Sequence, residues 1–417
     1  MTVTSSLPLP ADGRGLTTGR EPVLDVRGLC VDYGVGAGSV RAVNDATFTL
    51  HRGEVLGLAG ESGSGKSTLA YALVRLLRAP GVITGGDVLF HSRPVGSSTT
   101  QTVDLLAADG RELRDYRWSE ISVVFQSAMH ALNPVSRIED QLTDALRQHR
   151  KGMSRAERHE RAVELLRMVG INGDRLSSYP HELSGGMRQR VMIAMALALE
   201  PQIVIMDEPT TALDVVTQRE ILEELMQLRE RLGFALIFIT HDLSLLLEFA
   251  DSIAIMYAGR IVEQAAGQDL LGTPRHPYSL GLLNSFPALH GERVRMTGIP
   301  GSPPSLKDLP SGCKFHVRCP FRMDRCAQQE PLLVRPFGDF GQEGERTVAC
   351  LLHDGAQQPP AQLAMTKETA AAALAAAGAA AVLVPAAVEL AGDGGSDGTT
   401  GITGITGTDE DPTGSTR

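Results

Sequence analysis

Apolar runs alternate with amphipathic segments through the first two thirds of the chain. The predicted strands are residues 23–31, 40–50, 54–59, 121–125, 203–206 and 235–240. Those at 203–206 and 235–240 are compact apolar runs between polar residues, which is typical of strands buried on both faces of a parallel sheet. The predicted helices are 66–77, 216–232 and most of 137–199. This order of elements predicts an α/β domain.

The pattern changes after residue 263. Residues 264–289 have a helical pattern, and Pro and Gly then become frequent from 298 to 312. After residue 357 the chain is an Ala tract followed by Gly-Thr repeats, which contain too little apolar surface to offset their conformational entropy on folding. We therefore expect a disordered N-terminus, an α/β domain, a C-terminal extension and a disordered tail, at residues 1–22, 23–265, 266–354 and 355–417.

The composition limits the classes of partner and location. The chain carries 39 Lys and Arg against 49 Asp and Glu, a formal charge of −10. We therefore expect no nucleic-acid surface, which needs clustered positive charge. The first 22 residues lack an apolar signal core, so export is not expected. Residues 370–388 carry no charge but are mostly Ala, and we interpret them as part of the tail rather than as a membrane span.

A glycine-rich loop joins the predicted strand 54–59 to the predicted helix 66–77. Its sequence, Gly60-Glu-Ser-Gly-Ser-Gly-Lys66-Ser67-Thr68, fits G-x-x-x-x-G-K-[ST]. Glycines let the backbone curl so that successive N–H groups face phosphate oxygens, and the helix start adds a positive dipole. Lys66 is suited to reach the outer phosphates and Ser67 to bind Mg²⁺. The predicted phosphate site consists of Gly60, Ser62, Gly63, Ser64, Gly65, Lys66, Ser67 and Thr68.

Two carboxylates follow the apolar strand 203–206. Asp207 is suited to hold Mg²⁺ through water, and Glu208 to orient or deprotonate an attacking water molecule. An apolar strand that ends in acids is common by itself. Beside the Gly60 loop, it predicts hydrolysis of a nucleoside triphosphate.

Residues 183–190 narrow this prediction to one family. Leu183-Ser184-Gly185-Gly186-Met187-Arg188-Gln189-Arg190 resembles the signature motif of ABC ATPases. The resemblance implies an ABC-type P-loop ATPase domain, with a RecA-like core, an antiparallel β subdomain and a helical signature subdomain. It also implies that Ser184, Gly185, Gly186 and Gln189 close over ATP bound by a second ATPase domain. Ser184 is equally suited to cap the helix that follows it.

Other ABC landmarks occur in the family's order within residues 23–265. Tyr33 resembles the aromatic residue that stacks on adenine, and Gln126 the glutamine that senses Mg²⁺ and the membrane partner. Asp214, in Ala212-Leu213-Asp214, resembles the loop that couples the two ATP sites. His241, in Thr240-His241-Asp242, resembles the switch histidine that touches the γ-phosphate. The resemblance thus implies that Lys66, Glu208 and His241 are catalytic, with Mg²⁺ held by Ser67, Gln126 and Asp207.

The C-terminal extension resembles that of oligopeptide and dipeptide importer ATPases. The matching segments are His276-Pro277-Tyr278-Ser279, Pro300-Gly301-Ser302-Pro303-Pro304 and Gly312-Cys-Lys-Phe-His-Val-Arg-Cys-Pro320. Ser127-Ala128-Met129-His130 departs from the family pattern, which has Asp-Pro and then a small polar residue. The resemblance implies ATP-driven peptide import at the cytoplasmic face of the cell membrane. The implied partners are a second ATPase subunit, identical or paralogous, two transmembrane permease subunits and, indirectly, an extracytoplasmic peptide-binding protein.

Two alternative functions remain open at this point. ATPases with the same extension also serve importers of nickel, glutathione or other small solutes. A soluble ABC protein that acts on ribosomes or DNA is the second alternative. Ribosome-acting members usually carry two ATPase domains, and DNA-repair members carry a long coiled-coil insertion. This chain has one glycine-rich loop, one signature and no insertion of that length.

Four of the five cysteines, Cys313, Cys319, Cys326 and Cys350, fall in the extension, and Cys30 stands alone in an apolar stretch. Without an export signal, disulfides are disfavoured. Free thiols, zinc and an iron–sulfur cluster remain, although zinc sites usually pair cysteines as C-x₂₋₄-C and no such pair occurs here. Importer ATPases with this extension can carry a 4Fe–4S cluster at matching cysteines. We therefore predict a 4Fe–4S cluster on these four residues, with Zn²⁺ as the alternative.

Overall fold

The computed structural model describes residues 20–34, 36–93, 99–126, 131–210, 213–285, 298–336 and 346–355, together with Pro360 and Leu363. Most of the two segments predicted to be disordered, 1–22 and 355–417, lies outside the described residues. The departing segment Ser127–His130 and Ala212 lie outside them as well.

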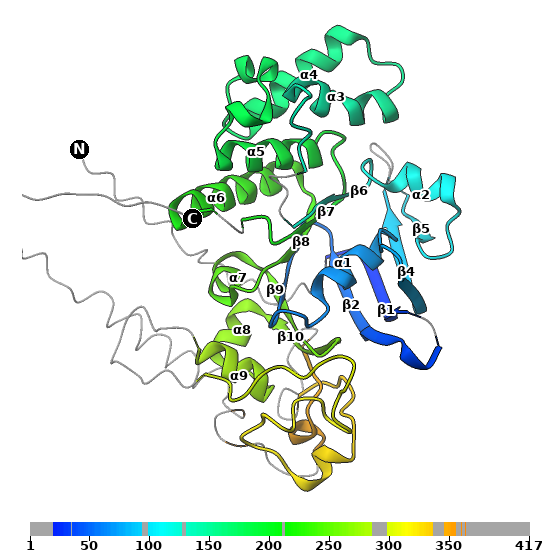
Figure 1. Cartoon of the computed structure of the whole chain (residues 1–417), viewed down its shortest axis with the longest axis vertical. Coiled ribbons are helices and arrows are strands. Elements are labelled where there is room, and N and C mark those ends of the chain that lie inside the picture. Colours follow the sequence, from blue (N-terminus) through cyan, green and yellow to red (C-terminus); the bar gives the residue numbers. More distant parts are fainter. Residues whose placement is uncertain are drawn as a thin grey trace, which may run out of the picture.

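Two β-sheets form the centre of the molecule (Figure 1). The larger sheet has the strand order β11-β10-β9-β3-β8-β7-β6. Its strands are β3 (Val55–Ala59), β6 (Ile121–Val124), β7 (Ile203–Asp207), β8 (Ala235–Ile239), β9 (Ser252–Tyr257), β10 (Arg260–Ala266) and β11 (Thr347–Val348). The five from β9 to β6 are parallel, whereas β10 and β11 add to one edge in antiparallel pairing.

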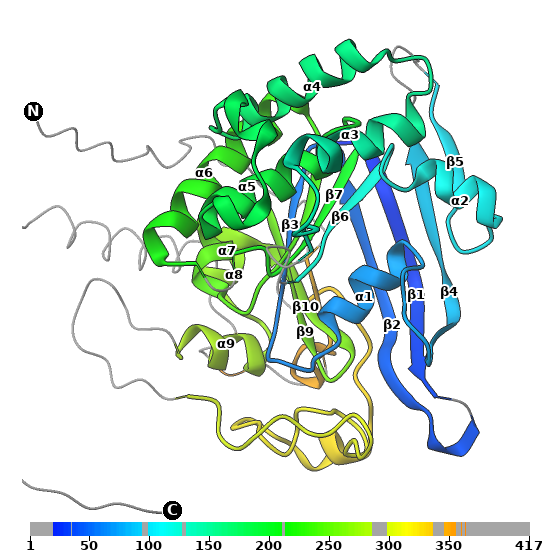
Figure 2. The ribbon, with the colours of Figure 1, turned by 45° about the horizontal axis from the view of Figure 1, so that its top comes forward.

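The smaller sheet is antiparallel, in the order β2-β1-β4-β5. Its strands are β1 (Pro22–Tyr33), β2 (Val40–His51), β4 (Gly81–Ser92) and β5 (Gln101–Asp104). Helix α1 (Lys66–Leu73) lies between the two sheets in both ribbon views (Figures 1 and 2). Apolar residues of both sheets and of α1 form one continuous buried cluster. The smaller sheet therefore covers one face of the larger sheet, with α1 between them.

Helices cover the other face of the larger sheet. Those nearest the sheet are α5 (Gly185–Ala196), α6 (Val215–Leu232), α7 (Leu243–Phe249) and α8 (Gly267–Gly272), which α9 (Pro277–Leu283) follows. Helices α3 (Ile138–His149) and α4 (Arg155–Met168) pack on α5 at the upper end of Figure 1, and the short α2 (Gly110–Tyr116) lies beside β5. Along β7, Ile203 and Ile205 face α1 whereas Val204 and Met206 face the helices. Because both faces are covered, the strand is apolar throughout, and this continuous pattern made it predictable.

Helix α1 is shorter than the predicted segment 66–77. Arg75 has a positive φ of 52°, and the helix ends at Leu73. The guanidinium group of Arg117 donates hydrogen bonds to the carbonyl oxygens of Val74 (2.9 and 2.8 Å) and Arg75 (2.7 Å). A distant arginine thus satisfies carbonyl groups that a longer helix would have paired internally.

The predicted helical region 264–289 begins instead as a strand. Residues 264–266 belong to β10 and pair with β9 through Gln264–Ala254 and Ala266–Ser252. Helices α8 and α9 follow, and residues 286–289 lie outside the described residues. A short apolar run is compatible with either a strand or a helix, and here the pairing with β9 decides for the strand.

The extension completes the larger sheet. Strand β11 pairs with Glu263 and Gln264 of β10. The buried Glu263 carboxylate accepts hydrogen bonds from the backbone N–H groups of Arg275 (2.7 Å) and His276 (2.8 Å), and pairs with Arg346 at 3.3 Å. The extension as a separate domain at 266–354 stays a prediction, and its described parts are anchored in the core of the α/β domain.

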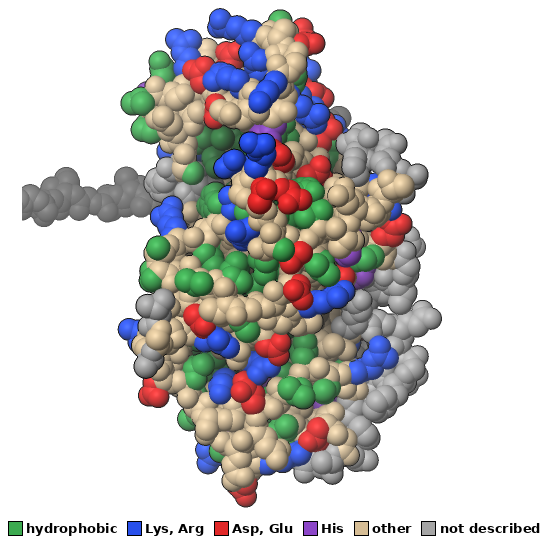
Figure 3. Space-filling view, turned by 90° about the vertical axis from the view of Figure 1, so that its right-hand side faces the viewer, with side chains coloured by type: hydrophobic (Ala, Val, Ile, Leu, Met, Phe, Trp, Pro, Cys, Tyr) green, Lys and Arg blue, Asp and Glu red, His purple; other side chains and the backbone are tan. Residues whose placement is uncertain are grey.

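Charged groups are unevenly distributed on the surface. In Figure 3, Lys and Arg side chains gather at the upper end of the molecule, over α3 and α4, with acidic side chains between them. None of the helices within the described ranges combines the length and the apolar character that crossing a membrane requires.

Burial of His276 makes stability depend on pH. Its Nδ1 accepts the hydrogen bond of the Tyr278 N–H (3.0 Å) at the start of α9, so the ring is neutral. Burial, and secondly the nearby His353, lowers its pKa from 6.5 to about 3, against a hydrogen bond with the Ala349 backbone that favours the charged form. Between these values the unfolded chain binds more protons, so the free energy of unfolding falls as pH falls.

We expect His276→Asn to reduce this acid sensitivity. Asparagine keeps an acceptor for the helix start but does not titrate. Between pH 7 and pH 5 the free energy of unfolding of the wild type should fall by about 2 kcal/mol more than that of the variant. Urea denaturation at both values measures the difference, with exposed His181→Asn as the control for loss of an imidazole. Equal acid sensitivity in wild type and His276→Asn would contradict the assignment.

Candidate functional site

The glycine-rich loop lies between the end of β3 at Ala59 and the start of α1 at Lys66. Gly60 and Gly65 have φ values of +149° and +104°, which L side chains rarely adopt. A Cβ atom on Gly60 would lie 2.2 Å from the Met256 carbonyl oxygen, and one on Gly65 would lie 2.4 Å from that of Ala42. Glycine is therefore required here both by conformation and by close backbone packing.

Lys66 holds its ammonium group inside the curve of this loop. Its Nζ donates hydrogen bonds to the carbonyl oxygens of Gly60 (2.8 Å) and Glu61 (3.0 Å). The side chain is buried, and burial lowers the pKa of Lys66, partly offset by the carboxylates of Glu208, Asp207 and Glu61. A buried cation at a helix start provides strong local attraction for an anion.

Asp207 faces α1 from the end of β7. Its carboxylate accepts hydrogen bonds from Ser67 Oγ (3.0 Å) and from the Tyr71 hydroxyl (3.0 Å). Burial raises the pKa of Asp207, against the hydrogen bonds from Ser67 and Tyr71, and burial also raises the pKa of Tyr71. Sequence reasoning missed Tyr71. Its spacing of four from Ser67 on one helix was the available signal, because such residues share a face.

Glu208 lies within reach of two further predicted residues. Its Oε2 accepts a hydrogen bond from Gln126 Nε2 (3.2 Å), and its Oε1 lies 3.5 Å from Nδ1 of the exposed His241. Gln126, Glu208 and His241 follow β6, β7 and β8, and the glycine-rich loop follows β3. Since these parallel strands are neighbours, their carboxyl ends deliver four groups of polar side chains to one edge of the sheet.

Tyr33 joins this region from the smaller sheet. It ends β1, and its hydroxyl lies 3.3 Å from Oγ1 of Thr68 in the first turn of α1. A Cβ atom on Gly81 would lie 3.1 Å from its ring. The glycine therefore leaves space beside the half-buried ring, at the same end of α1 as Lys66.

The signature residues occupy a second location. Ser184 accepts the hydrogen bond of the Met187 N–H (3.2 Å) as the N-cap of α5, so the helix-cap interpretation holds. Asp214 caps α6 by accepting from the Thr217 N–H (3.0 Å) and hydroxyl (2.8 Å), and these hydrogen bonds lower the pKa of Asp214.

The two helix starts are close together. A Cβ atom on Gly186 would lie 2.8 Å from Thr217 Cγ2, and Gln189 is buried in α5. The side chains of Ser184 and Asp214 each bond within the first turn of their own helix, whereas Lys66 and Asp207 bond to residues 60–71.

The iron–sulfur prediction is wrong. Among the residues that the structure describes, no group of three or more His, Cys, Asp or Glu is arranged to hold a metal ion, which overturns both the 4Fe–4S cluster and the Zn²⁺ alternative at Cys313, Cys319, Cys326 and Cys350. All four are free cysteines. Burial raises the pKa of Cys313, Cys319 (to about 11) and Cys350, so these thiols are neutral at pH 7. Cys313 and Cys319 pack against the main apolar cluster, Cys350 belongs to a smaller one, and Cys326 is buried, as is usual for free cysteines.

Comparison with known proteins gives two family matches. The sequence model of the ABC transporter family matches residues 43–211, and that of the C-terminal region of oligopeptide/dipeptide transporters matches residues 262–326. The oligopeptide transport ATP-binding protein OppD of Salmonella typhimurium is 46% identical over 74% of this chain and 90% of its own length. The dipeptide transport ATP-binding protein DppD of Caldanaerobacter subterraneus subsp. tengcongensis is 39% identical over 80% and 97%.

Solved structures resemble the α/β domain. The dimeric structure of MJ0796, described as a bacterial ABC transporter cassette, has a TM-score of 0.51 and 29% sequence identity, and covers 58% of this chain and 98% of that one. A dimeric post-hydrolysis state of MJ0796 bound to ADP and phosphate also matches, with a TM-score of 0.50 and 29% sequence identity. The match covers 58% of this chain and 98% of that one.

The close packing at Gly60 gives a stability prediction. Gly60→Ala has to displace the Met256 carbonyl and strains φ, so the free energy of unfolding should fall by about 3 kcal/mol or more. Gly63→Ala is the matched control, because φ is +77° but no atom lies within 4 Å of the added Cβ. That variant should lose only about 1–2 kcal/mol. Urea denaturation measures both, and equal losses would show that packing against Met256 is unimportant.

Proposed function

The chain belongs to the ABC transporter family, in its oligopeptide/dipeptide branch, and from this premise we propose that it binds and hydrolyses ATP to power uptake of di- and oligopeptides through separate transmembrane subunits. The observation that carries the proposal is the convergence of Lys66, Asp207, Glu208, Gln126 and His241 at one edge of the parallel sheet.

The glycine-rich loop binds the phosphates in this proposal. Backbone N–H groups of residues 60–68 face the phosphate oxygens, and the Lys66 ammonium pairs with the outer phosphates. Tyr33, at the same end of α1, provides an aromatic face on which adenine stacks. The side chains of Ser62, Ser64 and Thr68 complete the lining of the loop.

The residues at the end of β7 fit a magnesium ion. Hydroxyl, amide and carboxylate oxygens are the hard donors that Mg²⁺ prefers, and Ser67, Gln126 and Asp207 supply one of each. Asp207 is fully buried and bonded to two neutral hydroxyl groups, so a cation nearby would offset the cost of its charge. Bound there, Mg²⁺ neutralises charge on the outer phosphates.

Hydrolysis is assigned to Glu208. Its carboxylate accepts a proton from a water molecule as the water oxygen attacks the γ-phosphorus, and ADP leaves with the electrons of the broken bond. Gln126 and His241 both contact Glu208 and hold its two oxygens in place. His241 is exposed, which leaves its ring free to contact the γ-phosphate.

We propose that the site is completed by a second ATPase subunit. The hydrogen bonds of Ser184 and Asp214 stay within the starts of α5 and α6. In this proposal Ser184, Gly185, Gly186 and Gln189 bind ATP held by a partner, with Asp214 close to the same junction. ATP then holds two subunits together, and its hydrolysis lets them open. That cycle drives the permease subunits. The dimeric form of MJ0796 supports this arrangement.

The assembly proposed is peripheral to the cytoplasmic face of the membrane. It contains this chain, a second ATPase subunit, two permease subunits and, indirectly, an extracytoplasmic peptide-binding protein. Peptides are favoured over nickel, glutathione or another solute because the relatives OppD and DppD are named for oligopeptide and dipeptide transport. The same names disfavour a soluble role on ribosomes or DNA.

Replacement of the proposed base tests the chemistry. Glu208→Gln should retain ATP binding and lower the hydrolysis rate by about 10²–10⁴-fold, the usual contribution of a general base. Single-turnover hydrolysis and equilibrium ATP binding measure the two effects. Asp207→Asn is the contrasting variant, since loss of a magnesium ligand should weaken binding of Mg²⁺–ATP itself. Near-normal hydrolysis by Glu208→Gln would refute the role of Glu208.

Replacement of the signature serine tests the second subunit. Ser184→Ala should leave ATP binding to the isolated chain intact and lower the ATPase rate of the assembled transporter by at least about tenfold, as for a lost charge-assisted hydrogen bond. Ser154→Ala is the matched control, because Ser154 caps α4 with the same 3.2 Å hydrogen bond but lies outside the signature. The cross-subunit assignment fails if both variants hydrolyse alike, or if Ser184→Ala loses ATP binding as an isolated chain.

A further inference from the structure

Two motifs of the extension meet at Glu61, the second residue of the glycine-rich loop. Arg318 lies in the segment Gly312–Pro320, and Tyr278 lies in α9. Both side chains are buried against the loop. Neither has a role in the proposed hydrolysis, so their contacts with the loop need a separate explanation.

Arg318 binds the Glu61 carboxylate with both arms of its guanidinium group. Nη1 donates to Oε2 (2.7 Å) and Nη2 donates to Oε1 (2.9 Å), which is the strongest geometry for such a pair. The guanidinium group is itself held in place, because Nε donates to the Pro300 carbonyl (2.8 Å) and its plane lies over the ring of Tyr257 at 5.8 Å. The Arg318 side chain is 7% exposed and that of Glu61 25%, so solvent screens this pair less than it screens a surface pair.

Tyr278 fixes the backbone of the same residue. Its hydroxyl oxygen accepts the hydrogen bond of the Glu61 N–H at 2.8 Å. The ring is fully buried and packs on Tyr257 and Phe315, with centroids at 4.6 and 5.4 Å.

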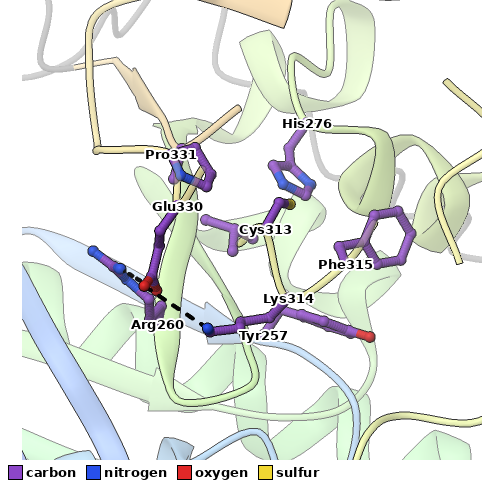
Figure 4. A pocket seen from close by; sticks show the side chains of 10 residues that line it. Tyr257, Arg260, His276, Cys313, Lys314, Phe315, Glu330 and Pro331 are labelled. Carbon is purple, nitrogen blue, oxygen red and sulfur yellow. Dashed lines mark hydrogen bonds and ion pairs between the residues drawn. The ribbon is translucent and has the colours of Figure 1, made fainter. Parts of the chain in front are cut away.

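The surrounding support also comes from the extension. Figure 4 shows Cys313, Lys314 and Phe315 beside Tyr257 and Arg260 of the β9–β10 hairpin. Glu330 bridges Arg260 and Lys314 there. The Tyr278 hydroxyl that binds the Glu61 N–H is therefore held in place by the packing of its ring in this aromatic cluster.

Glu61 in turn holds the functional part of the loop. Its carbonyl oxygen accepts hydrogen bonds from Lys66 Nζ (3.0 Å) and from the Ser64 N–H (3.2 Å). Its carboxylate adds a negative charge to a loop built to receive anionic phosphates. Without a cation beside it, that charge would repel the ligand and could pair with Lys66 instead.

We infer that Arg318 and Tyr278 are positioning residues for the phosphate loop, through which the extension sets nucleotide affinity. Arg318 neutralises the Glu61 carboxylate and Tyr278 fixes the Glu61 backbone. This inference rests on the proposed function, in which the loop binds ATP. It assigns to the extension a direct part in the ATP site of its own chain.

The test compares ATP affinity and turnover in the purified full-length chain. Arg318→Ala should weaken binding of Mg²⁺–ATP about 10- to 100-fold, the range for losing hydrogen bonds to a charged group. It should raise KM for ATP and leave kcat within about threefold of wild type, because the hydrolytic groups are untouched. Arg325→Ala is the matched control, since Arg325 forms a two-armed pair with Asp354 inside the extension, away from the loop. That variant should bind ATP as the wild type does.

Removal of the Glu61 carboxylate shows whether Arg318→Ala weakens ATP binding through the unpaired charge of Glu61 or through a general loss of folding. In a Glu61→Gln background, Arg318→Ala should change ATP affinity by less than about threefold, since no uncompensated charge remains. Tyr278→Phe keeps the aromatic packing and removes only the acceptor for the Glu61 N–H, so it should weaken ATP binding about 3- to 10-fold even if Arg318→Ala does not fold.

Several results would overturn the inference. The first is an unchanged affinity for Mg²⁺–ATP in both Arg318→Ala and Tyr278→Phe. The second is that Arg325→Ala weakens ATP binding as much as Arg318→Ala does. The third is that Arg318→Ala weakens ATP binding equally with and without Glu61→Gln. A wild-type chain that does not bind ATP would instead refute the proposed function, and the inference with it.

Discussion

The ammonium group of Lys66 is buried at the start of α1, so its positive charge has to be compensated by oxygen atoms at close range. Two carbonyl groups of one tight turn accept its hydrogen bonds, and the carboxylates of Glu208, Asp207 and Glu61 add negative charge nearby. Such a turn needs positive φ at Gly60 and Gly65 and backbone packing against Met256 and Ala42. The larger sheet provides the first of these backbone contacts and the smaller sheet the second. Both sheets are therefore needed for one side chain to be placed.

Sequence reasoning found the parts of the site that follow buried strands. Strands β3, β7 and β8 are apolar on both faces, and their ends are marked by Gly60, Asp207 and Thr240, so the strands and the positions of these candidate residues were predictable. Strands β4, β5, β9 and β10 were not predicted. β4 is buried only at Val88, Phe90 and Ser92, and the start of β10 has no strand pattern of its own but pairs with β9. Tertiary pairing of this kind leaves little local signal.

Residues that act through another residue were the hardest to find. Tyr71, Tyr278 and Arg318 reach the site across 136, 217 and 257 positions respectively. The cysteines show the opposite error, since their number and spacing suggested a ligand set, but spacing contains no information on whether four sulfur atoms converge with suitable geometry. Metal ligation depends on that geometry and on thiolate character, and neither can be counted along a chain.

The buried pair of Glu263 and Arg346 has a consequence for the nascent chain. Glu263 precedes its cation by 83 positions, and β11, which covers the edge of β10, is reached only after Arg346. At usual rates of about 5–20 residues per second, synthesis of that interval takes between about 4 and 17 s. During this time either the Glu263 carboxylate is buried without Arg346, or the edge of β10 stays unpaired and exposed. Translation speed between the two residues therefore sets how long the ribosome-bound chain offers that edge to strand pairing with other chains.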